Sequence, residues 1–330
     1  MIVGRFHSLL TRTRRLVVGL ALFGWIGAAL TLTANPRSRG LMIAERLKQL
    51  SDAPNWELVA SETVSLKFPT FHPQGLVRIG QSFFMSSVHT IIAPQPSAEE
   101  PKYDRTAGKG DGYLFQFDAS GKLINHIQLG GDTIFHPGGV DFDGESIWVP
   151  VAEYRPKGRT IVYKVNPQTL AAVEAFSADD HIGAIAVDRL NRFVYGLNWD
   201  SELIYRWGLD GKQQFVKVIQ NRKLGYQDCE YLQQTAYMVC GGVIQERLMS
   251  VKKLLYFMHL LEHLYRGGID LIDLESVEMV RHVPVLLYTP GIVKRVLTQN
   301  PTYLELREDR LKLYFVPEDN DSTLYVFNVD

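Results

Sequence analysis

The sequence predicts an all-β chain that folds as a β-propeller, with a transmembrane helix before it and one helical insertion within it. The first observation is a repeat: "FHPQGLVRIGQSFFMSSVHT" begins at Phe71 and "FHPGGVDFDGESIWVPVAEY" begins at Phe135, with Phe, His, Pro, Gly, Gly and Ser at matching positions. The second is that the repeated runs are rich in Val, Ile, Tyr, Phe and Trp, as β-strands are. The third is that polar turn sequences such as Asp-Gly and Asn-Pro separate them.

The repeat unit consists of two hairpins, which together make four strands. A third copy begins at His181, and two weaker copies begin at Gln227 and Gln299. Each copy has the pattern of two short strands around a polar turn. A second hairpin follows each of the first four copies, as in "GYLFQFDASGKLINHIQL" and "LIYRWGLDGKQQFVKVI". Four antiparallel strands repeated in tandem predict the blade of a propeller.

The two ends of the repeat region complement each other. The fifth copy ends one strand short, with "STLYVFNVD" at the C-terminus, and "WELVASETVSLKF" (56–68) is a strand without a partner. We expect this N-terminal strand to supply the missing outer strand and close the ring, because closure removes two exposed sheet edges. Five blades are favoured. Six blades remain an alternative, because the stretches 91–110 and 286–298 are not assigned to strands.

An uncharged apolar segment precedes the repeats. Residues 16–34 carry no charge, and as a helix they would span about 28 Å, close to the ~30 Å hydrocarbon core of a bilayer. Arginines precede this segment and predict a cytoplasmic N-terminus. We therefore divide the chain into a basic stub with an anchor (1–35), a linker (36–55) and a propeller on the periplasmic or extracellular side (56–330). A cleaved signal peptide is the alternative, since the segment ends in small residues.

Charge and cysteine content narrow the possible partners. The formal net charge is −1 and no basic stripe lies outside the N-terminus, which excludes nucleic acid as a partner. Cys229 and Cys240 lie in strands expected to be antiparallel neighbours. A disulfide fits export to an oxidising compartment, and two buried thiols are the alternative. Two cysteines give no metal-site pattern.

Propeller geometry brings polar residues from different repeats to one mouth of the central channel. The first strand of a blade begins, and the second ends, on the same face of the ring. The first strands begin with His72, His136 and His181. The second strands end with His89, Glu153 and Asn198. Further candidates for ligand binding at this mouth are Tyr154, Arg155, Trp199, Gln227, Asp228, Asn300 and Glu318.

Three interpretations of this mouth stay open. His72, His136, His181 and Glu153 could bind a divalent metal ion, with Glu153, His136 and His181 as catalytic groups of a hydrolase or lyase. The mouth could instead bind a small polar molecule without a metal, with Trp199 as an aromatic wall. Alternatively, the repeated histidines are structural and tie strands to neighbouring loops.

Two insertions are predicted on the same face. Residues 91–112 are rich in Pro, Gly and charge and read as a long loop, whereas 246–266 have apolar residues at helical spacing. The helix contains "HLLEH" (259–263), which matches a zinc-protease pattern but lies in a short insertion of a β-rich chain. We favour an amphipathic lid there. These insertions also support an alternative function, a non-catalytic scaffold that docks a protein of the cell envelope.

Several long motifs resemble an uncharacterised bacterial family of exported proteins of unknown function. They include "FHPGGVDFDGESIWVPVAEYRP", "DDHIGAIAVD", "YQDCEYL" and "GGIDLIDL", and the resemblance extends from about residue 65 to the end. The helical insertion departs from the family pattern. More distantly, the repeats are similar to streptogramin-lyase and lactonase-like propellers, which hold a metal at the channel mouth with His, Glu, Asp or Asn. That similarity implies a metal or ligand site at the mouth, as an analogy of architecture.

Overall fold

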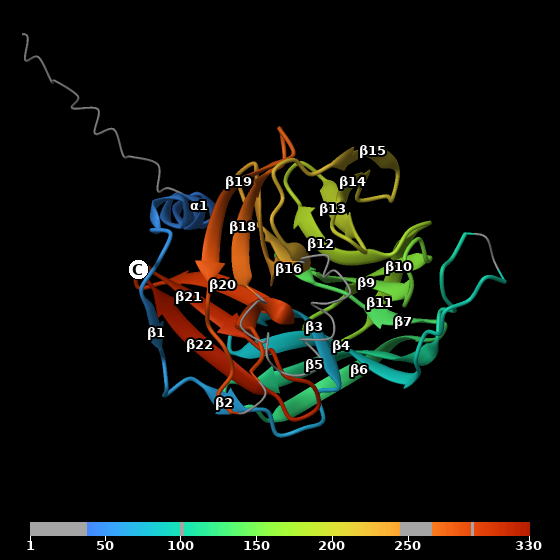
Figure 1. Cartoon of the computed structure of the whole chain (residues 1–330), viewed down its shortest axis with the longest axis horizontal. Helices are drawn as coiled ribbons and strands as arrows, with labels where there is room; N and C mark the ends of the chain where they lie inside the picture. The colour runs from blue at the N-terminus through green and yellow to red at the C-terminus, as the bar shows by residue number, and fades with distance from the viewer. Residues whose placement is uncertain (1–37, 100–101, 245–265, 292–293) are drawn as a thin grey trace, which may run out of the picture. The chain divides into compact units, whose positions relative to one another are not determined.

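The computed structural model describes residues 38–99, 102–244, 266–291 and 294–330, and within them nearly all regular structure is antiparallel β (Figure 1). The strands repeat in groups of four. The first strands of the groups are β3 (His72–Ile79), β7 (Ile134–Pro137) with β8 (Asp141–Phe142), β12 (Ile182–Asp188), β16 (Gly225–Tyr231) and β20 (Thr302–Arg307). The second strands are β4 (Ser82–Ile92), β9 (Ile147–Glu153), β13 (Phe193–Asn198), β17 (Tyr237–Val243) and β21 (Arg310–Phe315).

The outer strands complete each group. The third strands are β5 (Lys109–Asp118), β10 (Thr160–Val165), β14 (Leu203–Gly208), β18 (Gly267–Asp273) and β22 (Thr323–Val329). The fourth strands are β6 (Leu123–Asp132), β11 (Ala172–Ala178), β15 (Gln213–Val218) and β19 (Glu278–Val285), and β1 (Trp56–Leu58) takes this place beside β22. The order β12-β13-β14-β15 and the order β16-β17-β18-β19 are complete four-stranded sheets. The ladder pairing between the groups β3–β6 and β7–β11 within the described residues is a single one, of Gly131 with Ile134.

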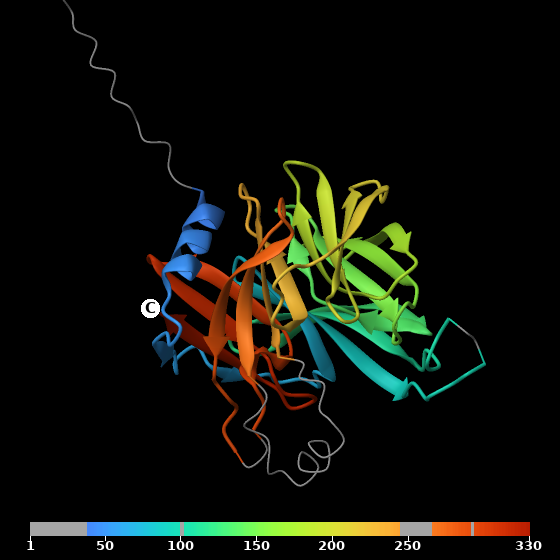
Figure 2. The same ribbon diagram turned by 45° about the horizontal axis from the view of Figure 1, so that its top comes forward.

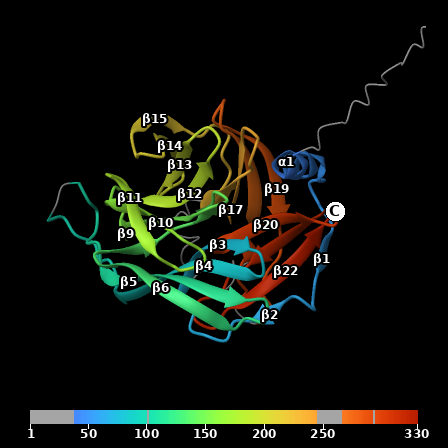
Figure 3. The ribbon, with the colours of Figure 1, turned by 180° about the vertical axis from the view of Figure 1, so that it is seen from behind.

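The first strands of the groups pack against one another. β12 contacts β16 and β9, β16 contacts β3 and β20, and β3 contacts β8 and β20. Figures 1 and 3 show these strands on the inner side of the sheets, with the later strands of each group further out. Several four-stranded antiparallel sheets whose first strands meet at a common centre are the architecture of a β-propeller, so the predicted all-β propeller class is confirmed, while the number of five blades stays a prediction.

The N-terminal strand pairs with the C-terminal strand as predicted. β1 runs antiparallel to β22, with Trp56 opposite Val329 and Leu58 opposite Phe327. The short strand β2 (Val64–Ser65) also pairs with β22. The chain thus places a strand from each of its ends in one sheet, which covers an edge that β22 would otherwise expose.

The expected linker contains a packed helix. Residues 39–49 form α1 (Arg39–Gln49), which begins after Ser38, whose Oγ accepts a hydrogen bond from the Leu41 amide at 3.2 Å. Ile43, Ala44 and Leu47 are buried in a core that they share with strands β18 to β22. Their i, i+1, i+4 spacing gives α1 an apolar stripe. Figure 2 shows α1 lying along the sheets rather than away from them.

The predicted insertions are only partly within the described residues. β4 extends to Ile92 and β5 begins at Lys109, so the loop between them is shorter than 91–112. Pro96 and Arg105 form an isolated bridge inside this loop, which projects from the sheets (Figure 1). The apolar segment 16–34 and residues 246–265, with the "HLLEH" pattern, lie outside the described residues. Within the part of the chain that is described, no helix combines the length and apolarity needed to cross a bilayer.

The repeated glycines permit the first strands to approach closely. A Cβ atom added to Gly138 would lie 2.2 Å from the carbonyl oxygen of Gly183, and one added to Gly75 would lie 2.6 Å from the amide nitrogen of Val140. Both neighbours are backbone atoms of another group of strands, so they cannot yield as a side chain would. This close approach explains the glycines that follow His72 and His136. At Gly183 an added Cβ atom would lie 3.8 Å from the nearest atom, so crowding does not require glycine after His181.

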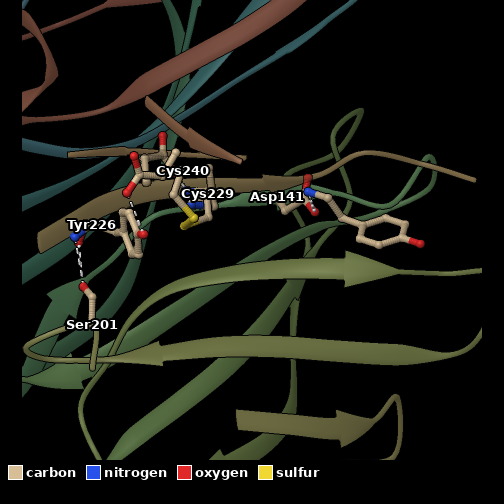
Figure 4. Close-up of a disulfide and its surroundings, with 9 residues drawn as sticks. Asp141, Ser201, Tyr226, Cys229 and Cys240 are labelled. Carbon is tan, nitrogen blue, oxygen red and sulfur yellow. Dashed lines mark hydrogen bonds between the residues drawn. A yellow bond between two sulfur atoms is a disulfide. The ribbon is translucent and has the colours of Figure 1, made fainter. Parts of the chain in front are cut away.

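Cys229 and Cys240 form a disulfide that joins β16 to β17 (Figure 4). The two residues are direct cross-strand partners, with Cα atoms 4.1 Å apart. Beside them, the Tyr226 amide donates to Ser201 Oγ at 3.0 Å, which connects this sheet to its neighbour. Of the two alternatives that the sequence left open, the structure has the disulfide.

Candidate ligand site at the mouth of the inner strands

Four side chains from two strand groups, β7–β11 and β12–β15, meet at one end of the inner strands. His136 lies on β7, His181 immediately precedes β12, and Tyr154 and Trp199 directly follow β9 and β13. The His136 ring centroid lies 4.2 Å from that of Tyr154 and 5.3 Å from that of His181, and the His181 ring meets Trp199 at 4.6 Å. We call His136, Tyr154, His181 and Trp199 the mouth cluster. The sequence predicted all four at this mouth, and the structure brings them into contact.

A backbone carbonyl fixes the tautomer of His181. Nδ1 lies 2.7 Å from the carbonyl oxygen of Glu153, and since a carbonyl only accepts, Nδ1 carries the proton. Nε2 is therefore an acceptor, and it has no hydrogen-bond partner among the described residues. Burial lowers the pKa of His181 to about 4, although the hydrogen bond to Glu153 opposes this. At neutral pH the ring is uncharged.

The segment before His181 is held by several hydrogen bonds. The His181 amide donates to Oδ1 of Asp180 at 2.8 Å, and Asp180 Oδ2 accepts from the Tyr205 hydroxyl. Thr160 Oγ1 donates to the Asp180 carbonyl and accepts from the Ile182 amide. These contacts restrict the backbone on both sides of the imidazole, so its orientation is set before any ligand arrives.

His136 is also a buried neutral imidazole. Only 6% of the residue is exposed, and its Nδ1 is enclosed without a hydrogen-bond partner in the described part of the chain. Burial, followed by the nearby imidazoles of His181 and His72, lowers the pKa of His136 well below its usual value. An enclosed polar atom without a partner costs roughly 1–3 kcal/mol, a cost that a ligand hydrogen bond or an ordered water would remove.

The loop between β4 and β5 brings a cationic side chain to the aromatic rings. The Arg105 guanidinium lies 5.5 Å from the Trp199 ring centroid and is bonded to Asp104 at 2.8 and 2.9 Å. The same loop brings the Tyr103 ring centroid within 3.4 Å of the Arg155 guanidinium. The loop was expected on this face, and Tyr103 and Arg105 were not among the predicted site residues, because nothing in a Pro- and Gly-rich stretch marks which side chain turns inward.

His72 belongs to a polar group next to the cluster. Its Nδ1 lies 2.7 Å from Oδ1 of Asp319, and the other Asp319 oxygen lies 3.1 Å from Arg295. Burial would raise the pKa of Asp319, but the hydrogen bond with His72 and the charge of Arg295 lower it. The carboxylate is therefore ionised and compensated. The acidic run "PEDND" (317–321) was expected at this mouth, and of its side chains it is Asp319, not Glu318, that pairs with His72.

Several predicted site residues use their polar groups within the protein. The Glu153 carboxylate binds Arg155 Nε at 2.9 Å and accepts from the Arg159 amide. The Glu318 carboxylate accepts from the Tyr325 hydroxyl and the Thr323 amide. The amides of Asn198 and Asn300 act locally: Asn198 Oδ1 accepts from the Leu203 amide, and Asn300 donates to the Pro317 carbonyl.

Asp228 has a structural role that differs from its predicted place as an orienting group. Its Oδ2 accepts from the Leu76 amide at 2.7 Å, and its Oδ1 accepts from the Val140 amide at 3.0 Å. The buried carboxylate thereby links three inner strands. Gln227 lies in the bulge between Tyr226 and Asp228. His89 stacks on Phe71 at 4.3 Å, with its Nδ1 3.8 Å from Asp111.

The predicted metal ligands do not fit a metal centre. A divalent ion needs several imidazole or carboxylate groups that converge on one point. Glu153 faces Arg155 and His72 faces Asp319, so two of the four predicted ligands point their polar atoms to protein partners. Within the described residues, no group of three or more His, Cys, Asp or Glu side chains is placed to hold a metal ion.

A family comparison covers nearly the whole chain. A family described as "Family of unknown function (DUF6454)" matches residues 29–330. The chain belongs to this family. The resemblance of the motifs to a family without an assigned function is thus confirmed, and the DUF6454 match brings no activity with it. No curated protein matches this DUF6454 chain.

Solved structures similar to the chain include propellers with unrelated sequences. A hypothetical protein from Leishmania major shares 10% identity over 80% of this chain and 89% of its own, with a TM-score of 0.47. Luciferin-regenerating enzyme shares 8% identity over 84% of this chain and 95% of its own, with a TM-score of 0.43. The WD40 domain of Toxoplasma gondii coronin shares 7% identity over 85% of this chain and 87% of its own, with a TM-score of 0.39. With TM-scores below 0.5, these likenesses carry no functional argument, and the fold assignment rests on the sheet topology.

Proposed function

We propose that this DUF6454 protein is a five-bladed propeller that binds a small, uncharged, hydroxylated organic molecule at the mouth cluster. The observation that carries the proposal is the hydrogen bond from His181 Nδ1 to the Glu153 carbonyl, which leaves Nε2 as an acceptor with no partner among the residues that the structure describes. A ligand hydroxyl would donate to this nitrogen. The ring of Trp199, in contact with His181, would pack against the carbon skeleton of the ligand.

The charge balance of the mouth favours an uncharged ligand. His136 and His181 are neutral at pH 7 because their pKa values are lowered. The charged groups around them are already compensated, since Arg105 is paired with Asp104 and Glu153 with Arg155. An ionised ligand would lose its hydration without finding a free counter-charge among these groups.

The proposal includes a membrane-anchored propeller outside the cytoplasm. Its support is the disulfide between Cys229 and Cys240, which persists in oxidising compartments, together with the uncharged apolar segment 16–34 and the arginines before it. Five blades follow if the β3–β6 and β7–β11 groups are separate blades and β1 closes the last one.

The test is a thermal-shift screen of the purified full-length chain against uncharged polyols and monosaccharides, with gluconate as a charged comparison. A ligand present at 100 times its Kd stabilises the folded state by ~2.7 kcal/mol, which raises the Tm measurably. We expect at least one neutral compound to bind and to change the tryptophan fluorescence, and gluconate to have no effect.

The variant His181→Asn separates binding from folding. The asparagine amide can still donate to the Glu153 carbonyl but has no counterpart of Nε2, so the fold is kept and the ligand shift is lost. The control is His126→Asn on an exposed part of β6, which should keep the shift. The proposal fails if none of the neutral compounds binds, or if His181→Asn binds as well as the wild type.

A further inference from the structure

A cavity of about 400 Å³ lies at the opposite end of the inner strands from the mouth cluster. His72 begins β3 at the mouth, whereas Arg78 near the end of β3 lines this cavity. Glu230 of β16 and Tyr303 and Glu305 of β20 line it as well, and Arg39 of α1 contributes to its wall. Nothing in the proposed ligand site uses these residues.

One of the cavity carboxylates is fully compensated. Glu305 accepts from Arg78 at 2.8 Å and from the Tyr314 hydroxyl at 2.6 Å, and it also binds Arg307 at 2.7 Å and Arg39 at 3.3 Å. Burial would raise its pKa, but these partners lower it. Glu305 is therefore ionised, and it neutralises much of the positive charge that lines the cavity.

Glu230 is the uncompensated carboxylate. Its Oε1 is enclosed and has no hydrogen-bond partner in the described part of the chain. The groups that face it are mostly acidic: Asp141 from β8, Asp228 from its own strand and Glu305 from β20, with Arg39 from α1 as the cation and Tyr303 as a further neighbour. Burial, followed by these acidic neighbours, raises the pKa of Glu230 well above its usual value.

A second enclosed polar atom lies on the same cavity. The side chain of Arg78 is 8% exposed, and its Nε lacks a hydrogen-bond partner among the described residues, while NH1 holds Glu305. Two polar atoms on the cavity thus lack hydrogen-bond partners among the described residues: the acceptor Oε1 of Glu230 and the donor Nε of Arg78. The remaining lining includes apolar side chains, among them Ile43, Val77 and Leu232.

We propose that this cavity binds a small organic cation that carries a protonated primary amine and a neutral oxygen acceptor, that is, a short amino alcohol. The amine would donate to Glu230 and the oxygen would accept from Arg78 Nε. A carboxylate on the ligand is disfavoured, because the groups that face Glu230 are mostly acidic and the guanidinium of Arg78 is already paired with Glu305. An inorganic cation is disfavoured too, since the cavity is far larger than one ion and no metal-binding group exists within the described residues.

Three probes of equal heavy-atom count test the two contacts separately on the full-length chain by titration calorimetry. They are 3-amino-1-propanol, n-butylamine and 1-butanol. We expect 3-amino-1-propanol to bind, n-butylamine to bind roughly tenfold more weakly because Arg78 Nε stays unpaired, and 1-butanol not to bind. Comparable binding of 1-butanol and 3-amino-1-propanol, or no binding of the amino alcohol, overturns the proposal.

Variants and proton release provide the controls. Glu230→Gln keeps the shape of the side chain but removes the charge, and should weaken 3-amino-1-propanol at least roughly tenfold, whereas Glu308→Gln in an exposed turn should have no effect. Because Glu230 must ionise when the cation binds, binding should release a proton, which is measured in buffers of different ionisation enthalpy. Equal affinity of Glu230→Gln and wild type, or displacement of the probe by K⁺ or Ca²⁺ at matched ionic strength, contradicts the assignment.

Discussion

At His181 one hydrogen bond sets the tautomer of the imidazole, and burial sets its charge. The Glu153 carbonyl holds the proton on Nδ1, and burial keeps the ring neutral. The same burial makes the folded state sensitive to acid, because a buried neutral imidazole resists the proton that the unfolded chain accepts. His136 acts in the same direction, since burial lowers its pKa as well.

The acid sensitivity of His181 can be measured. Its folded-state pKa of about 4 lies below the unfolded value near 6.5, so the unfolded chain binds more protons between these values and stability falls as the pH falls. Between pH 7 and pH 4 this group alone should cost about 3 kcal/mol of unfolding free energy. The difference in unfolding free energy between wild type and His181→Asn, measured by urea titration, should therefore shift by about that amount in favour of the variant between pH 7 and pH 4. Parallel pH profiles would contradict the assignment.

Asp141 contributes with the opposite sign. Burial raises its pKa to about 7, even though its oxygens accept from the amides of Phe142, Val187 and Tyr231. A carboxyl group with a raised pKa stabilises the folded state most at low pH, and this contribution is lost as the pH rises through 7. The comparison with His181→Asn is needed for this reason, because the pH profile of the wild type alone combines opposing groups.

At the scale of single elements, the strand pattern was predictable and several contacts were not. The second hairpins at β5–β6, β10–β11, β14–β15 and β18–β19 occur where apolar runs flank polar turns, since that pattern is local. Helix α1 was missed because its apolar stripe is short and lies in a stretch with Ser, Arg and Lys. Its burial depends on a groove made by strands more than 180 residues away, which no local pattern reports.

In the candidate site too, features set by local sequence were predictable and contacts between distant segments were not. The start of a first strand is fixed by the repeat, so His136 and His181 were found. The partners of a charged side chain depend on loops from elsewhere, so the pairing of His72 with Asp319 and of Arg105 with Asp104 near Trp199 was not foreseen. Asp228 was assigned to the mouth because a sequence does not distinguish a carboxylate that faces solvent from one that caps backbone amides.

Asp228 links the inner strands, and its loss should be costly. In Asp228→Asn one oxygen becomes an NH₂ group that faces the amide of Leu76 or Val140, so a buried donor loses its acceptor. We expect the unfolding free energy to fall by about 2–3 kcal/mol, as measured by urea denaturation. Asp179→Asn, at an exposed position before β12, should leave stability unchanged. If both variants are equally stable, the amide contacts of Asp228 contribute little.

At the scale of the whole described ring, one sheet contains strands from both ends of the repeat region. Its strands β20, β21 and β22 come from the C-terminus, and β1 comes from residues 56–58. Contacts between residues so distant in sequence form against the loss of chain entropy on loop closure, so they stabilise the fold only once the loop is closed. We therefore expect the pairing of β1 with β22 to contribute measurably to the stability of this sheet.

The register of β1 and β22 provides a matched pair of proline variants that tests this closure. Asn55 and Asp330 exchange two backbone hydrogen bonds, and the Val59 amide donates to the Val326 carbonyl. In an antiparallel pair every second residue is hydrogen-bonded to the partner strand, so the amide of Glu57 points to β22 and the amide of Leu58 points away from it. Glu57→Pro should remove a ladder hydrogen bond and lower the unfolding free energy by about 2–3 kcal/mol, with faster hydrogen exchange along β22. Leu58→Pro inserts the same ring at an outward-facing amide and should cost much less. Equal losses in the two variants would mean that β1 does not hold the ring closed.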